Sequence, residues 1–132
     1  MRNRRPPEDF LVLIVDDDET VRSLLEVIVT SAGYRVATAS DGKSAAAQLD
    51  AVHPNLVITD LMMPGVGGYE FLRSLQTGDS KRLPIFVVTA SDLDRSTIAM
   101  IRQEANVMEF IAKPINSKKL LLALEKTLRP VV

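Results

Sequence analysis

Residues 11–19 read Leu-Val-Leu-Ile-Val-Asp-Asp-Asp-Glu, so five apolar residues are followed directly by four acidic ones. An unbroken apolar run of this length predicts a strand over 11–15 that is buried on both faces. The segment behind it has apolar residues at helical spacing, namely Val21, Leu24, Leu25 and Ile28. Gly33 is a natural C-terminal cap for that helix. The stretch therefore predicts a strand and a helix with the acidic residues at their junction.

The same alternation of a short apolar run and a longer segment of helical period recurs along the chain. It predicts further strands over 34–38, 56–59, 85–88 and 108–111. It predicts further helices over 41–50, 69–75, 92–104 and from Asn116 or Ser117 to about Leu128. Right-handed crossovers between such units give an α/β fold, with an open parallel sheet that has helices on both faces. Ligands of these sheets bind beyond the carboxyl ends of the strands.

Length and composition indicate one domain without covalent staples. The chain has 132 residues, of which 46% are hydrophobic, and it has no cysteine. With 16 basic and 17 acidic residues, the net charge predicts no general attraction to nucleic acid or to an anionic membrane. We expect a flexible N-terminal arm over 1–9, a folded domain over 10–129 and a tail over 130–132. The absence of cysteine, of a signal peptide and of a run of ~18 apolar residues favours a cytoplasmic location without membrane insertion.

Polar residues follow four of the five predicted strands. Asp16 and Asp17 follow the first, Asp60 the third, Thr89 the fourth and Lys113 the fifth. Each of them alone has an ordinary explanation, because Asp caps helices, Thr ends strands and Lys is usually solvated. Together, three carboxylates at one edge repel one another and would raise their own pKa values unless a cation compensates. Oxygen ligands of this kind favour Mg²⁺, with Mn²⁺ as a substitute.

A carboxylate in this setting can carry out phosphoryl transfer. Asp60 could attack phosphorus and become an acyl phosphate, while the metal ion and the ammonium of Lys113 neutralise the transferring oxygens. The hydroxyl of Thr89 could then donate a hydrogen bond to a phosphoryl oxygen and draw its loop toward the site.

Four strings in this order resemble the receiver (CheY-like) family over essentially residues 10 to 129. They are the stretch at 11–19, Thr-Asp-Leu-Met-Met-Pro-Gly at 59–65, Val-Val-Thr-Ala at 87–90 and Lys-Pro at 113–114. Each string is weak alone, but their order, spacing and position at strand ends make the set specific. The resemblance implies a flavodoxin-like (βα)5 doubly wound sheet with strand order 2-1-3-4-5.

The resemblance also implies a metal site around the phosphoacceptor. In this reading Asp60 accepts the phosphoryl group, Asp17 binds Mg²⁺ directly and Asp16 assists. The backbone carbonyl of Met62 completes the protein's share of the coordination.

Three further residues match the family's phosphate contacts and switch. Lys113 matches the phosphate-contacting lysine and Thr89 the switch hydroxyl. Phe110 stands where the family often carries a switch aromatic, and the alternative is an ordinary aromatic of the fifth strand. The implied function is to take a phosphoryl group from a histidine kinase or phosphotransfer protein and to control a downstream protein or fused output domain, without conventional enzymatic turnover.

Several positions depart from the family pattern without removing a chemical residue. Ala105 and Asn106 replace the usual Gly-Ala, Ile115 replaces a frequent Phe, and Asn55 stands where Asp is common. Because the first two changes fall on the family's usual output face, they put in doubt any particular mode of phosphorylation-dependent dimerisation. The single histidine, His53, lies in a predicted loop, so the phosphodonor histidine is expected on another protein.

Two alternative functions make different demands on the sequence. A haloacid-dehalogenase-type phosphatase also uses an Asp nucleophile, but it needs a second Asp two residues later, where this chain has Met62. A phosphorylation-independent interaction module would keep the fold while losing the acceptor, the acid pair or the lysine. All of these residues are present.

Overall fold

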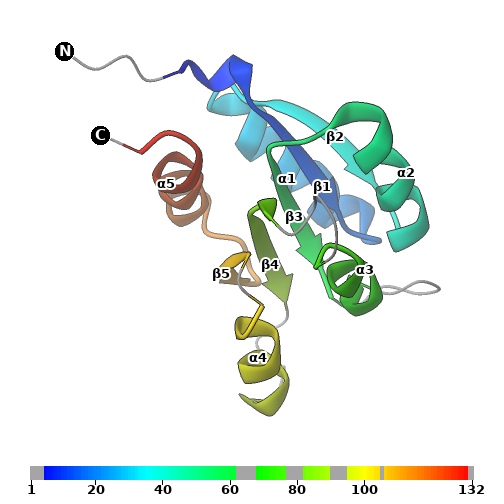
Figure 1. The fold of residues 1–132 in the computed structure, drawn as a ribbon. Helices are drawn as coiled ribbons and strands as arrows, with labels where there is room; N and C mark the ends of the chain where they lie inside the picture. Colours follow the sequence, from blue (N-terminus) through cyan, green and yellow to red (C-terminus); the bar gives the residue numbers. More distant parts are fainter. Residues whose placement is uncertain (1–4, 62–67, 77–81, 90–94, 105, 131–132) are drawn as a thin grey trace.

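The computed structural model describes residues 5–61, 68–76, 82–89, 95–104 and 106–130 (Figure 1). Strands and helices alternate along these ranges after a short 3-10 helix at Pro7–Asp9. The strands are β1 Leu11–Val15, β2 Arg35–Ala39, β3 Leu56–Asp60, β4 Ile85–Thr89 and β5 Val107–Ala112. The helices are α1 Glu19–Ser31, α2 Gly42–Val52, α3 Gly68–Ser74, α4 Arg95–Arg102 and α5 Ser117–Leu128.

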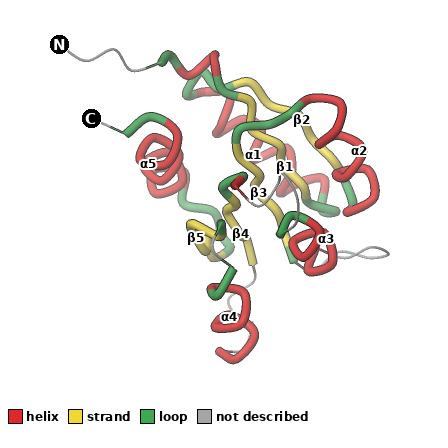
Figure 2. Tube along the Cα trace, viewed as in Figure 1, coloured by secondary structure: helices red, strands yellow, loops and turns green. Residues whose placement is uncertain are grey.

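The strands form one parallel sheet in the order β2-β1-β3-β4-β5, which confirms the predicted flavodoxin-like topology (Figure 2). Every residue of β1, β3 and β4 is buried, as expected for central strands covered on both faces. The edge strands β2 and β5 are only partly buried. Because all five strands run in the same direction, their carboxyl ends meet along one edge of the sheet.

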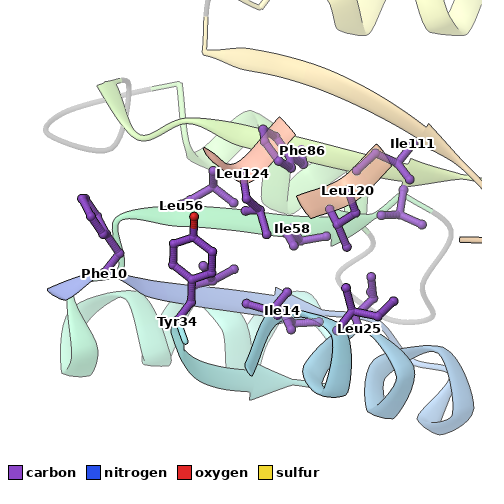
Figure 3. Packing of buried hydrophobic residues seen from close by; sticks show 14 residues of the cluster. Phe10, Ile14, Leu25, Tyr34, Leu56, Ile58, Phe86, Ile111, Leu120 and Leu124 are labelled. Atoms are coloured by element: carbon purple, nitrogen blue, oxygen red, sulfur yellow. The ribbon is translucent and has the colours of Figure 1, made fainter. Parts of the chain in front are cut away.

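Two hydrophobic clusters cover the two faces of the sheet. Since side chains alternate along a strand, Val12 and Ile14 of β1 join one cluster, whereas Leu13 and Val15 join the other. The first cluster takes in residues of α1 and α5, among them Leu25, Leu120 and Leu124 (Figure 3). The second takes in residues of α2, α3 and α4, among them Ala45, Phe71 and Ile101.

The facing of α1 differs in part from the prediction. Leu25 and Ile28 are buried as expected, but Leu24 is 44% exposed. Val29, which was not predicted to face the sheet, is buried instead. Successive residues lie about 100° apart around a helix, so a face centred on Leu25, Ile28 and Val29 excludes Leu24. Gly33 has a φ of 98°, which confirms its predicted role at the end of this helix.

Several element boundaries shift by one or two residues. The second strand is displaced by one residue from the predicted 34–38, and Asp60 is the last residue of β3 instead of the first residue after it. In α2, Ala45 faces the sheet, whereas Ala46 and Ala47 are exposed. The predicted start of the fourth helix at Asp92 lies outside the described residues. No helix within the described ranges has the length and apolar character needed to cross a bilayer.

Residues 5–9 of the expected arm contact the domain. The carbonyl of Glu8 accepts a hydrogen bond of 2.8 Å from Nε of Arg35. The carbonyl of Arg5 accepts one of 2.8 Å from Nε of Arg129, at the end of α5. This segment therefore joins the amino-terminal end of β2 to the end of α5, away from the acidic junction.

Candidate functional site

The parallel sheet brings three of the predicted site residues to one place. Asp16 follows β1 directly, Asp60 ends β3 and Lys113 follows β5. β1 and β3 are neighbours, so their two aspartates lie side by side. Lys113 comes from the edge strand, and its long side chain reaches past β4 to both carboxylates.

A lysine ammonium lies between two buried carboxylates. Nζ of Lys113 is 3.1 Å from Oδ2 of Asp60 and 3.7 Å from Oδ2 of Asp16. Asp16 has no exposed surface and Asp60 is 4% exposed. Asp17 is exposed at the surface of the same cluster, and one carboxylate oxygen of each of the three aspartates lies within 4.8 Å of the others. The three predicted metal-binding side chains therefore converge, and a single cation could contact all of them.

The backbone holds Asp16 in place from several directions. Its N–H donates to the carbonyl of Ala39 on β2 at 3.1 Å, and its Oδ1 accepts from the N–H of Asp18 at 2.9 Å. Its carbonyl accepts a 2.8 Å hydrogen bond from Nη1 of Arg22. Oδ2, in contrast, has no hydrogen-bond partner among the described residues. A buried carboxylate oxygen without a donor is an expected ligand for a hard cation.

The electrostatic environment moves two pKa values upward. Burial raises the pKa of Asp16, and the charges of Asp60 and Asp17 raise it further, against the lowering effects of the Asp18 N–H and Lys113. Burial alone would lower the pKa of Lys113, but its hydrogen bond to Asp60 and the charges of Asp60 and Asp16 outweigh this and raise it. The two shifts favour a charged lysine and disfavour the ionised form of Asp16.

The predicted switch residues lie on the neighbouring strands. Thr89 is the last residue of β4 and is buried. Its carbonyl accepts a hydrogen bond from the N–H of Lys113 at 3.0 Å. Its hydroxyl has no hydrogen-bond partner in the described part of the chain. Phe110 of β5 is half-buried, and the guanidinium carbon of Arg102 on α4 lies 4.7 Å from the centre of its ring. Met62, the predicted carbonyl ligand, lies outside the described residues.

Sequence reasoning did not single out Arg22. It lies in the first half of α1, where an arginine reads as an exposed helix residue, and only the structure reveals its contact with the carbonyl of Asp16. His53 ends α2 with an exposed side chain and a left-handed backbone of φ 49°, in agreement with its interpretation as a surface residue.

Comparisons with known proteins give one consistent family. The family model described as "Response regulator receiver domain" matches residues 12–125. The transcriptional regulatory protein AfsQ1 of Streptomyces coelicolor is 31% identical over 118 residues, which are 89% of this chain and 51% of that protein. Protein PetR of Rhodobacter capsulatus is 35% identical over 131 residues, which are 99% of this chain and 52% of that protein. This chain therefore spans about half the length of these relatives.

Solved structures agree with this match. Chemotaxis protein CheY4 of Vibrio cholerae superposes with a TM-score of 0.81 and 28% sequence identity. The match covers 90% of this chain and 98% of that one.

Proposed function

The chain belongs to the family of response regulator receiver domains, and from this premise we propose that Asp60 accepts a phosphoryl group. The donor is a phosphohistidine on a histidine kinase or a phosphotransfer protein. The observation that carries the proposal is the 3.1 Å contact between Nζ of Lys113 and Oδ2 of a buried Asp60, at the end of a central strand.

Asp60 fits the role of nucleophile better than the other two aspartates. Asp16 has one oxygen engaged by the N–H of Asp18 and no exposed surface, so an incoming phosphoryl group could hardly reach it. Asp17 is exposed, whereas the ammonium of Lys113 pairs with Asp16 and Asp60. Asp60 alone combines a strand-end position with a short contact to an ammonium that can neutralise charge on the transferred oxygens.

The donor set fits a hard divalent cation. Three carboxylates converge to within 4.8 Å, and Oδ2 of Asp16 is buried and accepts no hydrogen bond from the described residues, with the ammonium of Lys113 at 3.7 Å. Asp16, Asp17 and Asp60 would hold Mg²⁺ or Mn²⁺, with the carbonyl of Met62 as a further proposed ligand. When bound, the ion supplies positive charge next to the phosphoryl oxygens.

The bond changes of the transfer involve Asp60 and the donor histidine. A carboxylate oxygen of Asp60 forms the new bond to phosphorus, the phosphorus–nitrogen bond of the phosphohistidine breaks, and its electron pair stays on the imidazole. Lys113 remains protonated throughout and pairs with an oxygen of the acyl phosphate, because its pKa is raised in this environment.

Phosphorylation would then be read by Thr89 and Phe110. The hydroxyl of Thr89 is buried without a partner in the described residues, so it is available to donate to a phosphoryl oxygen. Movement of the end of β4 would alter the space beside Phe110, which pairs with Val87 across β4 and β5. We place the output in a downstream protein or a fused domain, since AfsQ1 is a transcriptional regulatory protein about twice as long as the matched region.

Intact-mass spectrometry after incubation with acetyl phosphate and Mg²⁺ tests the proposal. We expect an adduct of ~80 Da that disappears in Asp60→Asn and when EDTA removes the metal. Asp50→Asn, which changes an exposed carboxylate of α2, is the matched control and should keep the adduct. No adduct in the wild type would instead favour an interaction module that works without phosphorylation. An adduct that persists in Asp60→Asn would assign the acceptor to another residue.

A further inference from the structure

Arg22 is joined to two residues of the acidic junction. Its Nη1 donates to the carbonyl of Asp16 at 2.8 Å, and its backbone N–H donates to the carbonyl of Asp18 at 2.9 Å. The side chain is half-buried, in the first half of α1. The second contact is the ordinary first-turn hydrogen bond of α1, so what the arginine side chain itself contributes to the three-residue acidic turn is the bond to the carbonyl of Asp16.

The remaining hydrogen bonds close this turn into a ring. Oδ1 of Asp16 accepts from the N–H of Asp18, and Oδ1 of Asp18 accepts from the N–H of Thr20 at 2.9 Å, which caps α1. Asp17 lies between these fixed points. Because a peptide unit is planar, holding the carbonyl of Asp16 also orients the N–H of Asp17 and the direction in which its side chain leaves the backbone.

The guanidinium does not act as a counter-ion to the cluster. Within the described ranges, no ion pair joins Arg22 to a carboxylate, whereas Lys113 pairs with both Asp16 and Asp60. The contact of Arg22 with the junction is a hydrogen bond to a backbone carbonyl. Its effect on the cluster is therefore expected to come from geometry.

We propose that Arg22 is a positioning residue for the metal site, which holds the Asp16–Asp17 peptide so that both carboxylates face Asp60. The inference rests on the proposed function, because it takes these three aspartates to be the metal ligands. Residues that orient metal ligands from behind typically change metal affinity by a factor of ten or more, as hydrogen bonds to a ligand residue set its direction.

Isothermal titration of the full chain with MgCl₂ alone tests this inference. Arg22→Met keeps the apolar stem and removes the donors, and we expect it to raise the Kd for Mg²⁺ about tenfold. Arg22→Lys restores a donor and should recover most of the affinity. The matched control is Arg35→Met, which removes a guanidinium-to-carbonyl hydrogen bond of the same 2.8 Å length at the amino-terminal end of β2. The Kd of this variant for Mg²⁺ should equal that of the wild type.

The outcomes separate the inference from the proposed function. Unchanged affinity in Arg22→Met would overturn the inference while leaving the metal site intact. Affinity that is equally weak in Arg22→Lys and Arg22→Met would also overturn it, because the restored donor would then have no effect. A wild-type chain that binds no Mg²⁺ would overturn the proposed metal site and this inference together. Far-UV circular dichroism of each variant in EDTA establishes that it is folded before the titration.

Discussion

Replacing Asp16 with asparagine should stabilise the metal-free protein. Asp16 has no exposed surface, and burial makes the largest contribution to its raised pKa. An asparagine has nearly the same shape and can still accept the hydrogen bond from the N–H of Asp18 through Oδ1. The substitution thus removes a buried charge without removing the contact that orients the side chain.

The structure allows the competing charge terms to be compared. At an effective dielectric constant of ~20, the attraction across the 3.7 Å between Lys113 and Asp16 is ~4.5 kcal/mol. The repulsion from Asp60, with carboxylate oxygens within 4.8 Å, is at least ~3.5 kcal/mol. These terms nearly cancel, and exposed Asp17 adds a weaker repulsion, so the cost of burying the charge decides the sign. We expect Asp16→Asn to raise the free energy of unfolding by about 1–2 kcal/mol.

The gain should depend on pH in a defined direction. Because the folded-state pKa of Asp16 is raised, stability falls as the pH rises from the unfolded-state pKa to the folded-state pKa, and the full cost of the buried charge is present above the latter. Below the unfolded-state pKa of about 3.9, the wild-type side chain is neutral in both states, so the difference between the two proteins should vanish.

Urea unfolding followed by far-UV circular dichroism measures this difference in EDTA at neutral and at acidic pH. Asp41→Asn is the control, and it should lower the free energy of unfolding. Hydrogen bonds from the N–H and hydroxyl of Ser44 lower the pKa of Asp41, so its charge favours the folded state above its unfolded-state pKa. Adding Mg²⁺ should reverse the ranking, since the wild type keeps its full set of carboxylates. If Asp16→Asn proves less stable than the wild type in EDTA at neutral pH, Lys113 compensates the buried charge and the reasoning fails.

Three further substitutions test other parts of the account. Lys113→Ala should slow phosphorylation of Asp60 by acetyl phosphate by about 100-fold, measured from the initial rate of adduct formation, because the ammonium at 3.1 Å is lost; a rate near that of the wild type would contradict its role. Thr89→Val should leave the free energy of unfolding within about 1 kcal/mol of the wild type, because the buried hydroxyl has no partner among the described residues. The same substitution should abolish phosphorylation-dependent changes in amide NMR shifts along β4 and β5. Leu120→Ala should cost about 3 kcal/mol in urea unfolding, since the fully buried side chain of α5 packs in the first cluster; a loss below about 1 kcal/mol would mean that α5 does not pack as described.

The sequence predicted the sheet because its signals are local and strong. Apolar runs such as 11–15 have no alternation, which specifies strands buried on both faces, and the helical segments between them require parallel crossovers. The convergence of Asp16, Asp60 and Lys113 followed from the parallel direction of the strands, because the carboxyl ends of parallel strands meet at the same end of the sheet.

Details that depend on packing were less predictable. Leu24 is apolar and at helical spacing, but the position of the sheet relative to α1 favours Val29 instead. The side chain of Arg22 turns back toward the acidic junction, and no residue pattern indicates that hydrogen bond. Contacts of residues 5–9 with Arg35 and Arg129 likewise depend on where distant chain segments meet.

Mapping the phosphorylated residue tests the central claim most directly. Reduction of an acyl phosphate with borohydride converts that side chain to an alcohol, and fragment-ion mass spectrometry then locates it in the chain. After incubation with acetyl phosphate and Mg²⁺, we expect the alcohol at Asp60 alone. Its appearance at Asp16 or Asp17, or its absence from all three aspartates, would contradict the assignment of Asp60 as the phosphoacceptor.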